Sequence, residues 1–373
     1  MNTTTQPVLA GWAEQIQHAR AQQLQIDIRG GNTKAFYGGP QQGLVLDTTA
    51  LSGISSYEPS ELVVTVRAGT PLAELEAALA EKGQCLPFEP PRFGEPATAG
   101  ATVGGTVGGM VAAGLAGPSR AVVGTVRDYV LGATLLNGRA ECLSFGGTVM
   151  KNVAGYDVSR VLAGSLGTLG VICEVSLKVL PVAPATLSLR LEAGQTEAIR
   201  RVNEWGGQPL PLNASAWWDG MLVLRLSGAT AAVSAAARTI GGEPVDAALA
   251  STFWAGLRDH RDEFFVGAAK AVDAGASLWR LSVPATAAPL KLSGEQLLEW
   301  GGAQRWICTS APASVLRDVA QAAGGHAVLF RSGDKSAGVF APPAPPLDRI
   351  QRDLQRAFDP DRVFNPARLG ATA

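Results

Sequence analysis

A glycine-rich, uncharged stretch between Pro96 and Ser119 constrains this chain more than any other part of it. Seven glycines fall among these 24 residues, and none of the 24 carries a charge. Glycine lets a backbone lie directly against a ligand, although it costs chain entropy on folding. A fold keeps so many glycines together where backbone amides must reach something, commonly an anion such as a pyrophosphate. We therefore interpret this stretch as one wall of a cofactor site.

Three other interpretations of the stretch compete with this one. A membrane-spanning helix would carry small residues at four-residue spacing, as Gly100 and Gly104 do, but the bulky apolar side chains are too few to drive insertion. A flexible linker would be richer in serine. A Rossmann or Walker loop needs G-x-G-x-x-G or a Gly-Lys pair, and the sequence contains neither. A phosphate cradle of another kind is required.

Length and composition favour a two-domain globular protein. The chain has 373 residues, of which 46% are hydrophobic and 17% charged, enough to bury large cores. The net charge of −1 gives no electrostatic footprint for nucleic acid, and no export signal precedes the first helix. The four cysteines and three histidines are far apart in the sequence, which argues against a metal site. We expect a cytoplasmic protein without a transmembrane segment, whose chemistry comes from an organic cofactor.

Hydrophobic periodicity predicts alternating helices and strands over residues 1–183, the expected first domain. A helix at 10–23 precedes a strand at 24–28, which runs directly into the polar turn 29–34. This turn is either a strand end with solvated cations or a first phosphate-binding loop, in which glycine amides and Arg29 or Lys34 meet oxyanions. The other predicted elements are strands at 43–47, 61–67, 140–145 and 171–180, a helix that begins at Thr70-Pro71 and ends at Gly83, an apolar segment at 122–136 and a hairpin turn at Asn137-Gly138.

Composition changes at residues 181–184, where a second domain spanning 184–340 is expected to begin. Seven of the eight tryptophans lie between 205 and 306, and we interpret them as core rather than as a ligand box. Strands that alternate with alanine-rich helices predict an antiparallel sheet with helices on one face. In the third segment, 341–373, a proline-rich linker and a helix lead to residues 358–366, which we expect to return to the first domain. The predicted strands lie at 187–191, 214–218, 221–227, 278–283, 306–309 and 327–330.

Four motifs together resemble the FAD-binding fold of the vanillyl-alcohol oxidase / p-cresol methylhydroxylase (PCMH) class of flavoproteins. They are the loop 29–34, the glycine stretch 100–117, KNVAGYD at 151–157 with GSLGTLGVI at 164–172, and the ending 358–366. With its short second domain, the chain is similar to the FAD-binding E subunits of bacterial glycolate oxidase. The resemblance implies an α+β fold, in which a two-layer FAD-binding domain of two α/β subdomains is joined to a small antiparallel-sheet cap domain.

The resemblance also implies which residues hold FAD. No histidine occurs between His18 and His260, where covalently flavinylated members of the class carry one, so FAD should bind noncovalently. The implied cofactor residues are Arg29, Gly30, Gly31, Asn32, Thr33 and Lys34 in the first loop; Thr102, Gly104, Gly105 and Gly109 in the wall; Ser119 and Gly124 near the ribityl chain; Lys151, Asn152 and Tyr156 near the ring system; Gly164, Gly167, Gly170 and Ile172 near the adenine side and the middle; and Asn365 in the ending.

The second domain departs from related 2-hydroxy-acid dehydrogenases, which carry a histidine-rich metal and base motif there. Only His326 remains, followed by Arg331 and Lys335, and these three are the candidate catalytic residues. A lone histidine is either satisfied within its strand or catalytic, and it makes no metal site.

Three functions are consistent with these features. The first is the FAD-binding subunit of a complex that oxidises glycolate to glyoxylate. The resemblance then implies a sister flavin subunit, an iron–sulfur subunit and, through the complex, a peripheral position at the inner membrane. The second is a free-standing FAD-dependent dehydrogenase of small 2-hydroxy acids, in which Arg29, Arg331 or Lys335 would hold the substrate carboxylate. The third is a non-catalytic scaffold with structural FAD.

Overall fold

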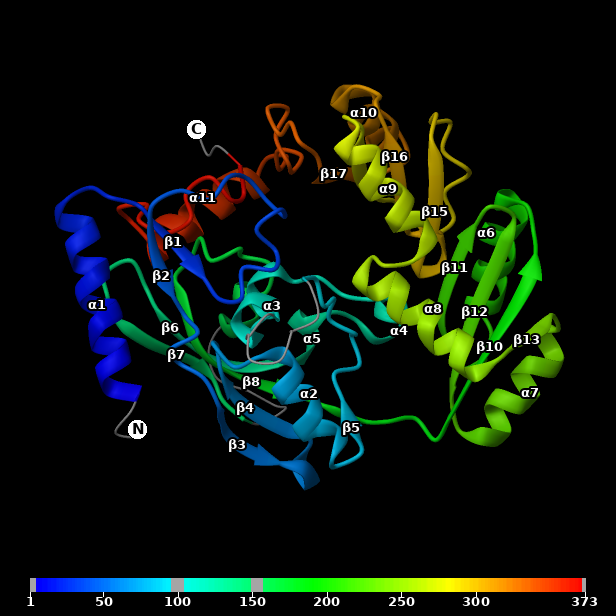
Figure 1. Cartoon of the computed structure of the whole chain (residues 1–373), viewed down its shortest axis with the longest axis horizontal. Coiled ribbons are helices and arrows are strands. Elements are labelled where there is room, and N and C mark those ends of the chain that lie inside the picture. Colours follow the sequence, from blue (N-terminus) through cyan, green and yellow to red (C-terminus); the bar gives the residue numbers. More distant parts are fainter. Residues whose placement is uncertain (1–4, 95–103, 149–156, 371–373) are drawn as a thin grey trace.

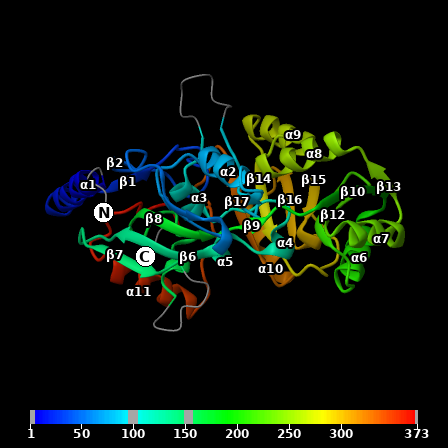
Figure 2. The ribbon, with the colours of Figure 1, turned by 90° about the horizontal axis from the view of Figure 1, so that it is seen from below.

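The computed structural model describes residues 5–94, 104–148 and 157–370. Two lobes lie side by side along the long axis of the molecule (Figure 1). The first lobe combines the N-terminal half of the chain with the C-terminal helix, and the second is built from the residues between them. A perpendicular view shows the same division (Figure 2). Every helix within the described ranges is too short or too polar to cross a bilayer.

The first layer of the first lobe is a two-stranded parallel sheet covered by one helix. Ile26 pairs with Leu44 in this sheet, and Trp12, Ile16 and Ala19 of the helix are buried against it. The helix begins earlier than the sequence predicted, because apolar residues already recur before residue 10. The elements are α1 (Thr5–Ala21), β1 (Ile26–Arg29) and β2 (Leu44–Asp47).

The second layer is a five-stranded antiparallel sheet with the order β3-β4-β8-β6-β7. Its core contains Leu72, Leu75 and Leu79 of α2 together with Val107 and Met110 of α3. A short pair, β5 (Gln84–Cys85) with β9 (Leu180–Pro181), closes its end. The elements are β3 (Ile54–Glu58), η1 (Pro59–Glu61), β4 (Val63–Arg67), α2 (Leu72–Ala80), α3 (Val107–Ala113), α4 (Arg120–Val123), α5 (Val126–Tyr129), β6 (Val130–Leu136), β7 (Cys142–Gly146), η2 (Ser159–Leu162) and β8 (Val171–Lys178).

The predicted hairpin in this layer is confirmed: Asn137-Gly138 lies in the connection between the antiparallel strands β6 and β7. The connection is the loop 137–141, in which the Asn137 side chain accepts hydrogen bonds from the amides of Arg139 and Glu141. The helix α2 begins just after Thr70-Pro71, but Thr70 is not its cap. The Thr70 hydroxyl contacts the backbone of Gly53, and Pro71 occupies the cap position.

The apolar segment 122–136 divides into parts of α4, α5 and β6, with a break at Gly124, whose φ is 89°. Its other glycine, Gly132, lies within β6 and breaks no element. Thr125 and Asp128 form a capping box at the start of α5. Gly124 is therefore required by the turn between two short helices.

The second lobe is built on an eight-stranded antiparallel sheet with the order β13-β10-β12-β11-β15-β16-β14-β17. Asp219-Gly220 forms the hairpin turn that joins β11 to β12, the predicted strands 214–218 and 221–227. Trp254, Trp279, Trp300 and Trp306 are buried, which confirms them as core residues. The elements are β10 (Ala185–Glu192), α6 (Gln195–Gly206), β11 (Leu212–Trp218), β12 (Met221–Gly228), α7 (Thr230–Ile240), β13 (Glu243–Val245), α8 (Ala247–Asp259), α9 (Glu263–Asp273), β14 (Ser277–Ser282), β15 (Glu295–Glu299), η3 (Trp300–Gly302), β16 (Gln304–Thr309), α10 (Ala313–Ala322) and β17 (His326–Arg331).

The C-terminal segment lies on the first lobe (Figure 1). In α11 (Leu347–Phe358) the residues Leu354 and Phe358 pack on the core of the second layer, whereas Leu347 and Ile350 are exposed. The chain then runs beside β1, where Phe364 forms a parallel bridge with Ile26. This contact brings the end of the described chain to the mouth of the turn 29–34.

Candidate cofactor site

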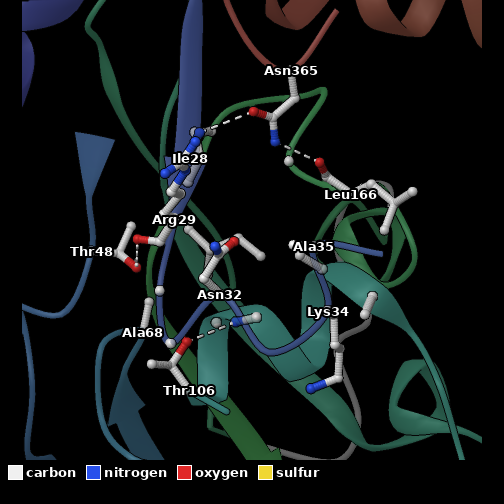
Figure 3. Close-up of a pocket in the computed structure, with 18 of the residues that line it drawn as sticks. Ile28, Arg29, Asn32, Lys34, Ala35, Thr48, Ala68, Thr106, Leu166 and Asn365 are labelled. Carbon is white, nitrogen blue, oxygen red and sulfur yellow. Dashed lines mark hydrogen bonds between the residues drawn. The ribbon is translucent and has the colours of Figure 1, made fainter. Parts of the chain in front are cut away.

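A pocket of about 780 Å³, open to solvent, lies between the two layers of the first lobe. The loop 29–34 forms one side and the start of α3 forms the other, while the segment 166–172 and the C-terminal segment close its far end (Figure 3). The residues that line it are Asp27, Ile28, Arg29, Gly30, Gly31, Asn32, Thr33, Lys34, Ala35, Gln41, Thr48, Ala68, Gly105, Thr106, Gly108, Gly109, Ala112, Ala113, Leu166, Gly167, Gly170, Ile172, Asn365 and Arg368.

The loop 29–34 presents unused backbone amides to this pocket. Within the described residues, the N–H groups of residues 30–34 donate no hydrogen bond to another protein group. Asn32 adopts a left-handed conformation with φ 52°, which asparagine tolerates better than most residues. Amides left free on a concave turn form an anion-binding nest. The loop is therefore suited to a pyrophosphate.

The glycines of the loop allow it to lie directly on the wall. A Cβ on Gly31 would stand 1.8 Å from the carbonyl oxygen of Gly104, and a Cβ on Gly30 would stand 2.3 Å from Oγ1 of Thr106. The Thr106 hydroxyl also accepts a hydrogen bond from the Gly109 amide at 3.2 Å. The two halves of the pocket are thus in backbone contact, which no larger residue would permit.

The C-terminal segment holds the pocket together from behind. Asn365 Oδ1 accepts from the Ile28 amide at 2.9 Å, and its Nδ2 donates to the Leu166 carbonyl at 2.7 Å (Figure 3). One side chain thereby joins the end of β1 to the segment that closes the pocket. Because both ends of the Asn365 side-chain amide are hydrogen-bonded in a buried place, they hold the two backbone segments in one geometry.

Arg368 fixes the other end of the first loop. Its buried guanidinium donates to the carbonyls of Lys34, Ala35, Tyr37 and Gly39. Burial lowers the pKa of Arg368, yet the group keeps its charge because an arginine loses its proton only far above neutral pH. The loop is therefore clamped around a cation that belongs to the C-terminal segment.

The pocket is electrostatically mixed. The Asp27 carboxylate is buried and accepts from Arg29 Nε at 2.5 Å and from Gln41 Nε2 at 3.2 Å. Lys34 Nζ would lie 3.2 Å from a Cβ on Gly105, so the ammonium faces the glycine wall across the pocket. Burial lowers the pKa of Lys34 to about 8, against the opposing effect of the Asp259 carboxylate. The lysine can therefore serve as a cation for an anionic ligand at neutral pH.

This lysine should make the stability of the FAD-free chain depend on pH. Below about pH 8 both the folded and the unfolded chain carry the charged Lys34, so folding bears the full cost of burying it. From pH 8 towards 10.5 only the folded chain loses the proton, and its stability rises. We expect Lys34→Met to have a higher free energy of unfolding than the parent at pH 7. The upper limit of the difference is roughly 3 kcal/mol, and solvent screening lowers it. Urea unfolding between pH 6 and 10 would show this advantage shrinking, and a difference independent of pH would contradict it.

The structure brings most of the described residues expected at the cofactor to this pocket, but four of them lie outside its lining. Gly104 contacts Gly31 from behind, while Ser119 is buried and bonded to the Pro87 carbonyl. Gly124 lies beside Asp128 at the turn into α5, and Gly164 contacts Gly114. Thr102, Lys151, Asn152 and Tyr156 lie outside the described residues.

The candidate catalytic residues do not gather at one point. Lys335 Nζ donates to the carbonyls of Phe36 at 2.5 Å and Gly38 at 2.9 Å, and the Arg331 guanidinium lies 3.5 Å above the Phe36 ring. Both side chains are therefore engaged with the segment that follows the first loop. His326 begins β17, where burial and the nearby Arg280 lower its pKa. None of the three lines the pocket.

Sequence reasoning missed several residues that shape the site. Asp27 was part of the predicted strand 24–28, and an acidic residue inside an apolar strand was the one available signal for it. Arg368 and Gln41 had no local signal, since each acts through a contact distant in sequence. The remaining missed lining residues are small or apolar and serve as walls.

The sequence is similar to a known domain family and to two glycolate oxidase subunits. Residues 12–146 match the family described as FAD binding domain. The chain is 46% identical over 358 residues to the glycolate oxidase subunit GlcE of Escherichia coli K12, with 96% of each chain covered. It is 32% identical over 139 residues to the glycolate oxidase subunit GlcD of Bacillus subtilis, covering 37% of this chain and 28% of that one.

A solved structure of alkyldihydroxyacetonephosphate synthase superposes with a TM-score of 0.62 at 13% identity, covering 94% of this chain and 73% of that one. This likeness concerns the fold alone, and it confirms the expected combination of an FAD-binding domain with an antiparallel-sheet domain. Since identity to GlcE extends over almost the whole of both chains, the chain belongs to the GlcE family of glycolate oxidase subunits.

Proposed function

We propose that this chain is the FAD-binding subunit of a complex that oxidises glycolate to glyoxylate, and that it transfers electrons through a noncovalently bound FAD. The observation that carries this proposal is the likeness to GlcE over 96% of both chains. The match of residues 12–146 to an FAD binding domain supports the cofactor. FAD, when bound, supplies the capacity to accept two electrons from an organic substrate.

The pocket of the first lobe is the proposed site of FAD. The free amides of residues 30–34 would hold the pyrophosphate, with the Lys34 ammonium as a further cation. Ile28, Leu166 and Ile172 supply apolar surface that excludes water. None of the described lining residues is a histidine, which supports noncovalent binding.

For partners, we propose a sister flavin subunit and an iron–sulfur subunit, and a peripheral rather than a spanning relation to the inner membrane. The name of the relative GlcE describes a subunit, and GlcD, another glycolate oxidase subunit, resembles part of this chain. Of the candidate catalytic side chains in the second lobe, Lys335 is bonded to the backbone and Arg331 is stacked on a ring, and none of the three lines the pocket. This favours electron relay within a complex over independent oxidation of the substrate.

Flavin spectroscopy of the reconstituted chain tests the proposal. We expect the FAD-loaded chain to keep its oxidised absorption band when glycolate is added without oxygen, and to lose it once the sister subunits are present. Bleaching of the isolated chain by glycolate would instead establish a free-standing dehydrogenase. A band that never changes within the active complex would leave a scaffold with structural FAD, and a chain that takes up no FAD would overturn the proposal.

A further inference from the structure

Residues 87–94, which we call the strap, immediately precede the glycine wall and contact both lobes. The strap contains Pro87, Pro90 and Pro91, and proline restricts the backbone freedom of such a segment. Its two aromatic residues anchor it on different sides. Phe88 is buried in the core of the second layer, whereas Phe93 belongs to the apolar cluster shared by the two lobes.

Glu89 is the residue of the strap that faces both lobes. Its carboxylate accepts a hydrogen bond from the Ser119 amide at 2.9 Å in the first lobe, and it forms an ion pair with Arg225 Nη2 of β12 at 2.7 Å in the second. The backbone of Glu89 has φ 49°, a left-handed conformation that costs a non-glycine residue about 1 kcal/mol or more. The fold keeps this strained residue where its side chain joins the two lobes.

Arg225 is prepared for this contact. Its Nε donates to Asn213 Oδ1 at 2.6 Å, and its guanidinium lies 5.0 Å from the centre of the Trp254 ring. The side chains of Arg225 and Glu89 are 11% and 24% exposed. Removing one member of such a pair leaves the other charge poorly solvated, so breaking the pair costs more than breaking an ion pair on the open surface.

The far end of the strap is tied to the second lobe as well. The Arg92 amide donates to Asp259 Oδ1 at 2.9 Å, and Arg261 Nη2 donates to the Gly94 carbonyl at 3.0 Å. Asp259 is the last residue of α8, and Arg261 follows it closely. The strap is therefore held by the second lobe at both ends.

The strap also lies against the loop of the cofactor pocket. Lys34 Nζ is 5.9 Å from the centre of the Phe93 ring, and a Cβ on Gly94 would stand 3.2 Å from Cγ2 of Thr33. Both Thr33 and Lys34 line the pocket. A change in the position of the strap must therefore displace the loop 29–34, whose amides are free.

We propose that the Glu89–Arg225 pair is a positioning device: it fixes the strap between the two lobes, and through the strap it sets the geometry of the loop 29–34 and so the affinity for FAD. Neither side chain lines the cofactor pocket, so the pair acts through the strap. The inference rests on the proposed function for the identity of the ligand. If the pair sets the geometry of this loop, its removal must change the affinity for FAD.

A double-mutant cycle on the full chain tests the device. Glu89→Gln and Arg225→Gln are each expected to weaken FAD binding about tenfold, within the range typical of coupling between sites. The double variant should lose no more than either single variant, since the two side chains act as one unit. The measurements are FAD titration by flavin fluorescence quenching and the visible circular dichroism of bound flavin, which should change in the same three variants. The matched control is Glu243→Gln, which removes the exposed Arg190–Glu243 pair of the second lobe and should leave both readouts unchanged.

If the losses of FAD affinity in the two single variants add up in the double variant, the two side chains act independently and the proposal is wrong. Unchanged affinity and unchanged dichroism in Glu89→Gln would also contradict it. Should Glu89→Gln fail to fold, Arg225→Lys retains the charge but loses the planar fork that contacts Glu89 and Asn213, and it should still weaken binding. If the parent chain binds no FAD, the proposed function is wrong. If the parent binds FAD and the variants bind it with the same affinity, only this inference is wrong.

Discussion

Alanine at position 31 is expected to abolish FAD binding, with a loss of at least roughly 100-fold in affinity, equivalent to about 3 kcal/mol. The new Cβ would stand 1.8 Å from the carbonyl oxygen of Gly104. That oxygen belongs to the backbone, so no side-chain rotation can relieve the clash, and the loop 29–34 must move away from the glycine wall. The amides proposed to hold the pyrophosphate move with it.

The measurement is an FAD titration of the refolded, cofactor-free chain followed by flavin fluorescence. Gly11→Ala is the matched control, because it makes the same substitution in the same lobe where a Cβ meets nothing within 4 Å. This control should bind FAD as the parent does, and it should be slightly more stable because alanine favours a helix. Parent-like affinity in Gly31→Ala would mean that the contact between loop and wall is not required for the cofactor.

Methionine in place of Arg368 is expected to lower the free energy of unfolding by about 3 kcal/mol and to weaken FAD binding with it. The guanidinium donates to four carbonyls of the segment 34–39, three of them at 2.7 to 3.2 Å. Only 6% of Arg368 is exposed, so water cannot replace the lost donors. Methionine fills most of the space but removes the donor from the carbonyls of Ala35, Tyr37 and Gly39, while the Lys34 carbonyl keeps the Tyr37 amide.

Urea unfolding of the cofactor-free chain and FAD titration measure the two effects of this change. Arg349→Met serves as the control, since Arg349 is an exposed residue of the same C-terminal segment. It should shift stability by no more than about 0.5 kcal/mol. Equal effects of the two substitutions would contradict the clamping role of Arg368.

The loop 29–34 could be predicted from the sequence because its signal is local. A strand ends, two glycines follow and a cation stands on each side, so the turn and its free amides need no distant partner to be recognised. The wall residues Gly105 and Gly109 were accessible for the same reason. So many glycines in a short stretch indicate that the backbone there approaches another group closely.

Other predictions relied on a residue being glycine or serine, a property that a turn or a tertiary contact requires as often as a cofactor does. Gly124 was expected near the ribityl chain, but the turn with φ 89° before α5 explains it. Ser119 was expected at the same place, and its polar groups are engaged by Glu89 and by the Pro87 carbonyl. A sequence shows that a residue is small or polar, whereas the partner that requires this property is set by tertiary contacts.

The strand β3 and the clamp at Arg368 could not be predicted for a related reason. Strand β3 is a polar edge strand, so it lacks the apolar alternation that identifies a strand. Arg368 acts across more than 300 positions of sequence, and nothing around it distinguishes it from an ordinary surface arginine.

The return of the C-terminal segment also orders events during synthesis. Residues 26–35 leave the ribosome early, yet the side chains of Asn365 and Arg368 that fix them emerge only after the entire second lobe has been translated. Cofactor loading on the nascent chain should therefore be delayed until these two residues have emerged. A premature stop codon shortly before position 365 should yield a translated but colourless product, open to proteolysis.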